Sequence, residues 1–183
     1  MTRPPGFTIV SSKTVADVGF LNIVMRTVET PAGEHVERVV IEHPGAVAVV
    51  PRVGEDVVLV AQYRAAVARV VLEIPAGKLD ESGESPEDAA RRELVEETGY
   101  RAGDLLHLTD LLTAVGFSDE KISIYLATDP VPGTARPVGA EEESAQIVTM
   151  PWTEAVTRVR DGSITDAKTV AGILIAEMLN GPA

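Results

Sequence analysis

The segment from Ile74 to Tyr100 constrains the fold more than any other part of this chain. It reads IPAGKLDESGESPEDAARRELVEETGY, which predicts a strand that ends in glycine, a polar loop and then a helix. Ser85 is placed to cap the amino end of the helix, Pro86 fits its first position, and Gly99 is a typical stop signal. We therefore expect a strand that leads, through a short loop, into a helix with defined ends.

Three carboxylates gather on one side of this helix. At about 100° per residue, Glu93 and Glu97 lie almost one above the other, and Glu96 lies beside them. Like charges four residues apart destabilise a helix by roughly 0.2–0.5 kcal/mol per pair, unless a cation lies between them. The alternative is a solvated acidic face on which Arg92 pairs with Glu96. Oxygen ligands from the strand end and the helix suit Mg²⁺ or Mn²⁺, which favours a metal site.

The remaining segments predict an α+β protein with a mixed sheet and few helices. Three strands rich in Val, Ile and Thr are expected before residue 44, as a β extension spanning 1–44. The main domain is expected over 45–183. Its expected strands are 45–51, 56–64, 67–75, 105–115, 122–129 and 145–150, and its later helices are 151–162 and 165–181.

Charge and composition exclude several classes of function. The formal net charge of −12 disfavours binding to nucleic acid or to an anionic membrane, because a polyanion would be repelled. The chain has no cysteine, which excludes disulfides, thiolate zinc sites and a thiol nucleophile. Residues 1–13 lack the pattern of a signal peptide, and no apolar run has the length of a membrane span. We therefore expect a cytoplasmic protein with a small-molecule partner.

The same segment resembles the Nudix box, a motif of glycine, glutamate and arginine at fixed spacing. The matching positions are Gly77, Glu84, Arg92, Glu93, Glu96, Glu97 and Gly99. Six residues separate Gly77 from Glu84, one more than the usual pattern, and the extra residue falls in the loop. We expect Glu84 and Arg92 to form an ion pair that orients this loop.

Further stretches resemble the ADP-ribose pyrophosphatase branch of that family: QYR at 62–64, EIPAGKL at 73–79, GFSDEKI at 116–122 and DAKTVAGILIA at 166–176. The resemblance implies a Nudix-type α/β/α sandwich around a mixed sheet, with an antiparallel N-terminal sheet at a homodimer interface. It also implies Mg²⁺-dependent hydrolysis of ADP-ribose to AMP and ribose 5-phosphate. Val115 stands where the branch usually has proline, so the preferred diphosphate substrate stays open.

Two alternatives to this activity remain. One is hydrolysis of another nucleoside diphosphate sugar or of a nucleotide, although the N-terminal strands and QYR argue against a triphosphate. The other is a sensor that binds ADP-ribose or a nucleotide without cleaving it. A sensor of this kind is expected to have lost carboxylates of the box, and none is lost here.

The resemblance also implies roles for individual acids. The implied metal ligands are the Ala76 carbonyl, Glu93, Glu97 and Glu143. Glu96 completes the cluster, directly or through water. In the acidic run AEEES, Glu141 falls where the family has its catalytic base, and Glu142 is expected to face solvent. Glu96 is the alternative base.

Four residues match positions that contact substrate in this branch. Arg64 ends the QYR strand, and Arg38 matches a position that reaches the active site of the partner subunit. An exposed strand position is an equally good interpretation of Arg38. Lys78 and Glu120 match further contact positions, with Lys78 contributing through its side chain or its backbone.

Overall fold

The computed structural model describes residues 6–136, 138 and 143–179. The chain divides into two compact units. The first unit comprises Met1–Gly45 with Leu112–Lys121, and the second comprises Ala46–Leu111 with Ile122–Ala183.

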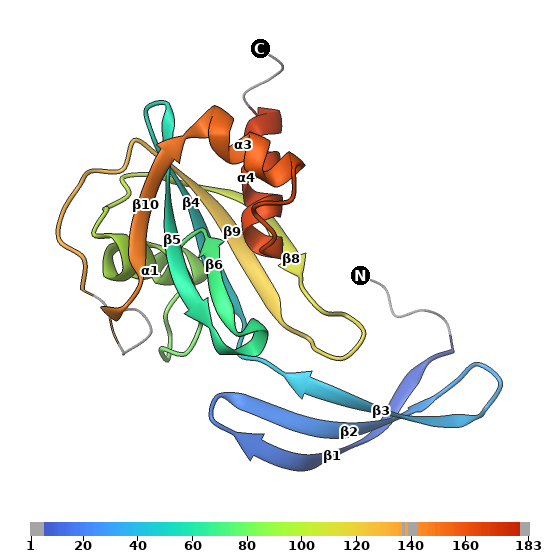
Figure 1. The fold of residues 1–183 in the computed structure, drawn as a ribbon. Helices are drawn as coiled ribbons and strands as arrows, with labels where there is room; N and C mark the ends of the chain where they lie inside the picture. The colour runs from blue at the N-terminus through green and yellow to red at the C-terminus, as the bar shows by residue number, and fades with distance from the viewer. Residues whose placement is uncertain (1–5, 137, 139–142, 180–183) are drawn as a thin grey trace. The chain divides into compact units, whose positions relative to one another are not determined.

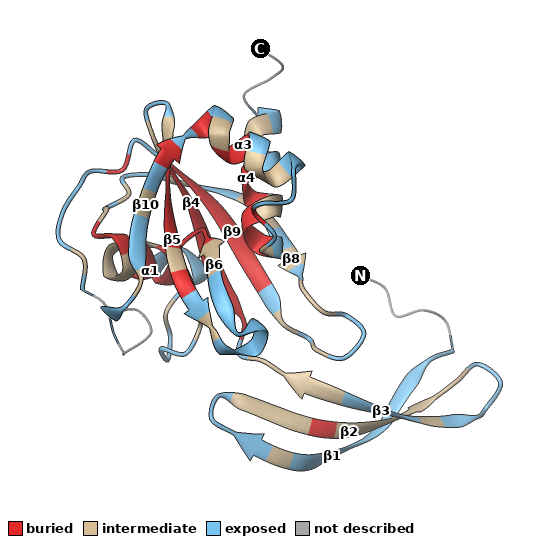
Figure 2. Ribbon diagram, viewed as in Figure 1, coloured by how far each residue is buried: buried red, intermediate tan, exposed pale blue. Residues whose placement is uncertain are grey.

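The first unit is built on an antiparallel sheet in the order β1-β2-β3 (Figure 1). Its strands are β1 (Thr8–Val18), β2 (Leu21–Glu29) and β3 (His35–Glu42). The predicted N-terminal antiparallel sheet is therefore confirmed. The segment 112–121 joins β3 through the Ile41 N–H, which donates to the Phe117 carbonyl at 2.7 Å. Figure 2 shows that most of the three strands is exposed or only partly buried.

The second unit contains a seven-stranded mixed sheet with the central order β10-β5-β4-β9-β8, in which β6 pairs with β5 and β7 pairs with β4. Strands β4 and β9 run parallel, whereas β4 and β5 form an antiparallel hairpin. The strands are β4 (Ala46–Val53), β5 (Asp56–Arg64), β6 (Arg69–Glu73), β7 (Ala76–Lys78), β8 (Leu105–Leu112), β9 (Lys121–Thr128) and β10 (Gln146–Pro151). The helices are α1 (Pro86–Thr98), α3 (Trp152–Arg160) and α4 (Ala167–Leu179), with a 3₁₀ turn at Ala65–Val67.

Alternation along β4 divides the core between the two faces of this sheet. Ala48 and Val50 belong to the cluster that also contains residues of α3 and α4. Val47 and Val49 belong to a second cluster, with Leu94 and other residues of α1. Helices therefore cover both faces, as the predicted α/β/α sandwich requires. Figure 2 shows the buried length of β4, β5 and β9 between them.

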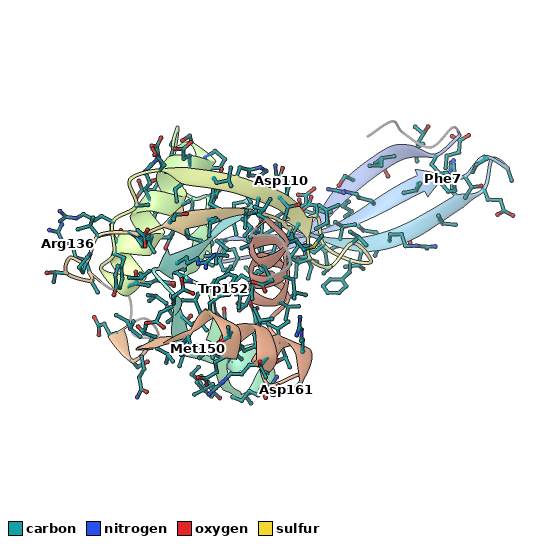
Figure 3. The ribbon with its side chains drawn as sticks, turned by 90° about the horizontal axis from the view of Figure 1, so that it is seen from above. Phe7, Asp110, Arg136, Met150, Trp152 and Asp161 are labelled. Atoms are coloured by element: carbon teal, nitrogen blue, oxygen red, sulfur yellow. The ribbon has the colours of Figure 1, made fainter. Side chains whose placement is uncertain are left out.

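Helix α4 packs closely on its face of the sheet. A Cβ placed on Gly172 would lie 2.8 Å from Val50 Cγ2, so glycine permits this approach. Trp152 lies beside α4, where β10 runs into α3 (Figure 3), and its indole N–H donates to the Glu177 carboxylate. Among the described residues, we found no helix with the length and apolar character needed to span a membrane.

One predicted strand, 67–75, is shorter in the structure, where β6 covers only Arg69–Glu73. Strand β6 ends at Glu73, and a new strand, β7, begins at Ala76 and pairs with β4 instead of β5. Pro75 lies at the break, where it has no N–H to give to a ladder, while its carbonyl accepts from the Val49 N–H at 2.9 Å. This corner moves the chain from pairing with β5 to pairing with β4.

Candidate active site

Helix α1 has the ends that its sequence predicts. Ser85 has an extended backbone, and its hydroxyl accepts from the Asp88 N–H at 3.1 Å. Gly99 ends the helix in the left-handed region, with φ of +77°, and its N–H donates to the Val95 carbonyl at 2.9 Å. The carboxylates of the helix are thus presented from a rigid element.

Two of these carboxylates lie against the backbone of β7. Glu93 is only 7% exposed, and a Cβ placed on Gly77 would come within 2.0 Å of its carboxyl carbon. Glu97 Oε2 accepts from the Ala76 N–H at 3.0 Å. Gly77 therefore leaves the space that Glu93 occupies, and the helical spacing of Glu93 and Glu97 brings both to the same strand, as predicted.

Arg92 binds three of the motif's glutamates. Its Nε and Nη2 each donate to the Glu84 carboxylate at 3.0 Å, which confirms the expected ion pair. Its Nη1 donates to Glu93 Oε1 at 2.8 Å and to Glu96 Oε2 at 3.0 Å. The hydrogen bond to Glu84 is the largest cause of the raised pKa of Arg92. Arg92 therefore links the loop to the acidic helix and offsets part of the repulsion there.

Arg64 is held by a glutamate that the sequence analysis did not identify. Its Nε donates to Glu73 Oε1 at 2.7 Å and its Nη2 to Glu73 Oε2 at 2.8 Å. The Lys168 ammonium donates to the same carboxylate. Burial acts to raise the pKa of Glu73, but the two cations hold that pKa below its ordinary value of 4.5. The sequence does carry a signal for this group, because Glu73 is an acid in an apolar strand, two residues before Pro75.

The donor atoms at this site are oxygens, the type that hard cations take. Glu93 approaches the Gly77 backbone closely enough to exclude a Cβ, so carboxylate and strand end form a narrow cradle. Within the described part of the chain, no three acidic or histidine side chains already surround a common point. The carboxylates of Glu93 and Glu96 instead accept from Arg92, and that of Glu97 accepts from the Ala76 N–H. The donor set fits Mg²⁺ or Mn²⁺, because a carboxylate can accept from Arg92 and still offer lone pairs to a cation.

The other candidate residues are distributed between the two units. Lys78 pairs with Asp80 at 3.1 Å, close to the box. Arg38 lies in the first unit and lines a cavity of about 510 Å³ there, together with residues of β1 to β3 and of 112–119. Glu120, also in the first unit, accepts from the Thr113 hydroxyl. Glu143 is exposed.

Glu141, predicted as the base, and its neighbour Glu142 lie outside the described residues. Among the described residues of the second unit, Glu93 and Glu97 of α1 meet Ala76 and Gly77 of β7. Arg64 on β5 is a further member of the candidate site. Glu97 contributes to the raised pKa of Arg64 after the hydrogen bond and charge of Glu73, so the guanidinium and the helix lie within electrostatic reach.

Comparisons with known proteins agree with this geometry. Residues 42–171 match the NUDIX domain. The chain is similar to the ADP-ribose pyrophosphatase of Bacillus subtilis (strain 168), with 37% identity over 154 residues, 84% of this chain and 83% of the relative. It is 40% identical over 172 residues to the ADP-ribose pyrophosphatase of Mycobacterium tuberculosis, covering 92% of this chain and 82% of the relative.

Two further comparisons widen the range of substrates among its relatives. A GDP-mannose pyrophosphatase of Cronobacter sakazakii is 36% identical over 132 residues, 68% of each chain. A solved structure described as an ADP compounds hydrolase superposes with a TM-score of 0.83 and 27% identity, covering 99% of this chain and 98% of that one.

Proposed function

The chain belongs to the NUDIX family as a Nudix pyrophosphohydrolase, and from that premise we propose that it hydrolyses ADP-ribose to AMP and ribose 5-phosphate with Mg²⁺. The observation that supports this most is the placement of Glu93 and Glu97 against Ala76 and Gly77. An acidic cluster of this kind can bind an anionic diphosphate only through a cation. Arg64 supplies a second positive group within electrostatic reach of the cluster.

Each residue has a part in the proposed reaction. Glu93, Glu97, Glu143 and the Ala76 carbonyl hold the metal. When bound, Mg²⁺ neutralises phosphate oxygens and makes a bound water more acidic. Arg92 keeps Glu93 and Glu96 oriented through the contacts described above. Arg64 binds the diphosphate by charge and hydrogen bonds.

The base completes the chemistry. Glu141 takes a proton from the attacking water as that water's oxygen forms a bond to one phosphorus. The bond between this phosphorus and the bridging oxygen breaks, and the second phosphate leaves with the electron pair. In the alternative assignment, Glu96 takes the proton.

Assembly is part of the proposal, because Arg38 is assigned to the partner subunit's site. The first unit exposes several large apolar side chains: Phe7, Ile9, Val10, Val15, Val18, Phe20 and Val39. Apolar side chains gathered on one small sheet are typical of a surface that another chain covers. We therefore expect a homodimer that uses this sheet, and light scattering at micromolar concentration tests its mass.

A second substrate class has its own support. Val115 is 76% exposed where the branch usually has proline, and one relative is a GDP-mannose pyrophosphatase. Other nucleoside diphosphate sugars are therefore the second candidate substrates. The non-catalytic sensor has weaker support, because Glu93, Glu96 and Glu97 are all present in the box.

One substrate panel tests these alternatives together. ADP-ribose and GDP-mannose are incubated with the protein, with and without Mg²⁺, and a phosphatase releases phosphate from the products. ATP is incubated without the phosphatase, and its products are separated by chromatography. We expect the highest kcat/KM for ADP-ribose and activity only with Mg²⁺. Equal or higher kcat/KM for GDP-mannose would favour the second candidate, and no hydrolysis of any compound would favour a sensor.

A further inference from the structure

A four-residue polar cluster lies where β5, β6 and the start of α4 meet. Glu73 is only 3% exposed, and it accepts from Arg64 on both carboxylate oxygens. The Lys168 ammonium donates to Glu73 and also pairs with Asp166 at 3.1 Å. Lys168 itself is 8% exposed. Two cations thus meet two carboxylates in a largely buried site.

Stability alone does not explain this arrangement well. Ion pairs taken out of water lose hydration that their mutual attraction only partly offsets, so apolar residues of similar size often serve stability as well or better. A buried carboxylate with two cations does fix the geometry of whatever it binds. Here the group that reaches out of the cluster is Arg64, whose side chain remains 37% exposed.

The cluster is anchored to the strand end that forms the site. Asp166 accepts from the Thr169 N–H at 3.0 Å and from the Thr169 hydroxyl at 2.6 Å. The Thr169 hydroxyl in turn accepts from the Ile74 N–H at 2.8 Å. The first turn of α4 is therefore tied to the segment that leads into Ala76. Lys168 extends from this turn to Glu73.

We propose that Lys168 is a positioning residue, which acts through Glu73 to hold the Arg64 guanidinium in the orientation that binds the substrate's diphosphate. This rests on the proposed function, in which Arg64 contacts that diphosphate. Nε and Nη2 of Arg64 both donate to Glu73, so the guanidinium is held in one orientation. Lys168 prevents the Glu73 carboxylate from rotating away from that bidentate contact. A positively charged group fixed before binding loses less entropy when the anion arrives.

The test is a double-mutant cycle between Lys168 and Arg64. Lys168→Met keeps the length of the side chain and removes its charge, and Arg64→Ala removes the group on which it is proposed to act. Affinity for inorganic pyrophosphate is measured by calorimetry with Mg²⁺, and KM for ADP-ribose is measured in parallel. We expect Lys168→Met to weaken pyrophosphate binding about tenfold and to raise KM about tenfold, which corresponds to about 1.4 kcal/mol. In the Arg64→Ala background, Lys168→Met should change neither.

A matched control removes another contact between the same two segments. Arg69 on β6 donates to the Thr165 hydroxyl at 3.0 Å, just before α4, without touching Glu73. Arg69→Ala should leave both affinities within twofold of wild type. Lys168→Gln is the second variant in case Lys168→Met does not fold, because it removes the charge and keeps a polar group beside Glu73, and it should also weaken pyrophosphate binding. In ¹⁵N spectra, the Nε proton of Arg64 should exchange faster with water in either Lys168 variant than in wild type, because its hydrogen bond to Glu73 is weakened.

Each outcome decides between the proposals. If Lys168→Met lowers the melting temperature but leaves affinity and the Nε–H signal unchanged, Lys168 is structural only and the inference fails. If the losses of affinity in the two single variants multiply in the double variant, the two residues act independently and the inference also fails. If wild type binds pyrophosphate but hydrolyses none of the compounds in the panel, the proposed function fails while the cycle still tests the positioning role. If wild type does not bind pyrophosphate at all, the inference fails, because Arg64 then has no diphosphate to bind.

Discussion

Gly77→Ala tests most sharply where the Glu93 carboxylate lies. A Cβ on Gly77 would be 2.0 Å from both Cδ and Oε1 of Glu93, whereas ordinary contact begins at 3.4 Å. The flexible end of Glu93 must therefore retreat by more than about 1 Å, because the added Cβ is fixed to the backbone of Gly77. Gly77 does not have a positive φ, so alanine itself is not strained there.

The magnitude follows from that displacement. Misplacing a group of the reacting site by about 1 Å can cost on the order of 100-fold in rate. We therefore expect kcat/KM for ADP-ribose to fall about 100-fold in Gly77→Ala, together with a higher Mg²⁺ requirement. Overpacking should lower the free energy of unfolding by about 1–3 kcal/mol. In a Glu93→Ala background, most of this loss of stability should disappear, because the clash is gone.

The assay compares initial rates over a Mg²⁺ titration with denaturant unfolding of the same preparations. Gly103→Ala is the matched control, since a Cβ there meets no heavy atom of the described residues within 4 Å, and Gly103 has no positive φ. The control should match wild type in both measurements. A Gly77→Ala variant with kcat/KM within threefold of wild type would refute the proposed role of Glu93.

Further variants test other parts of the account. Glu97→Gln should abolish most activity while the protein stays folded, and near-normal turnover at low Mg²⁺ would contradict its role as ligand. Glu141→Gln should lower kcat by roughly 10²- to 10⁴-fold with little change in Mg²⁺ affinity, whereas Glu143→Gln should raise the Mg²⁺ concentration needed. The folded-state pKa of Glu73 lies below 4.5, so its stabilisation is present above that pH and is lost as pH falls through the folded value. Glu73→Gln should thus lower the free energy of unfolding by about 3–5 kcal/mol at pH 7, and by much less at a pH below the folded-state pKa of Glu73. Denaturant titrations at these two pH values measure the difference. Val115→Pro should raise the preference for ADP-ribose over GDP-mannose in kcat/KM, and an unchanged ratio would show that Val115 has no part in selectivity.

Local signals predicted the helix that carries the candidate carboxylates. Ser85, Pro86 and Gly99 mark the ends of α1 in the sequence, and the structure places the helix at Pro86–Thr98 between a Ser85 cap and a Gly99 stop. The 3.6-residue period of a helix predicts that Glu93 and Glu97 share one face. These features depend on residues close together in the chain, so the sequence carries them directly.

Long-range partners were not predictable in the same way. Glu73 and Lys168 are 95 positions apart, and nothing in the pattern of either segment indicates the other. The association of 112–121 with β3 also depends on backbone hydrogen bonds between distant segments, such as Ile41 with Phe117. The break at Pro75 had a local signal, a missing N–H, but the pairing of β7 with β4 depends on the sheet as a whole.

The most direct test of the central claim is a product analysis of ADP-ribose incubated with the protein and Mg²⁺. Wild type should release AMP and ribose 5-phosphate in equal amounts, with no release after chelation of the metal and very little from Glu97→Gln. Absence of these products from wild type, or their undiminished formation by Glu97→Gln, would contradict the assignment of this reaction to the carboxylates of α1.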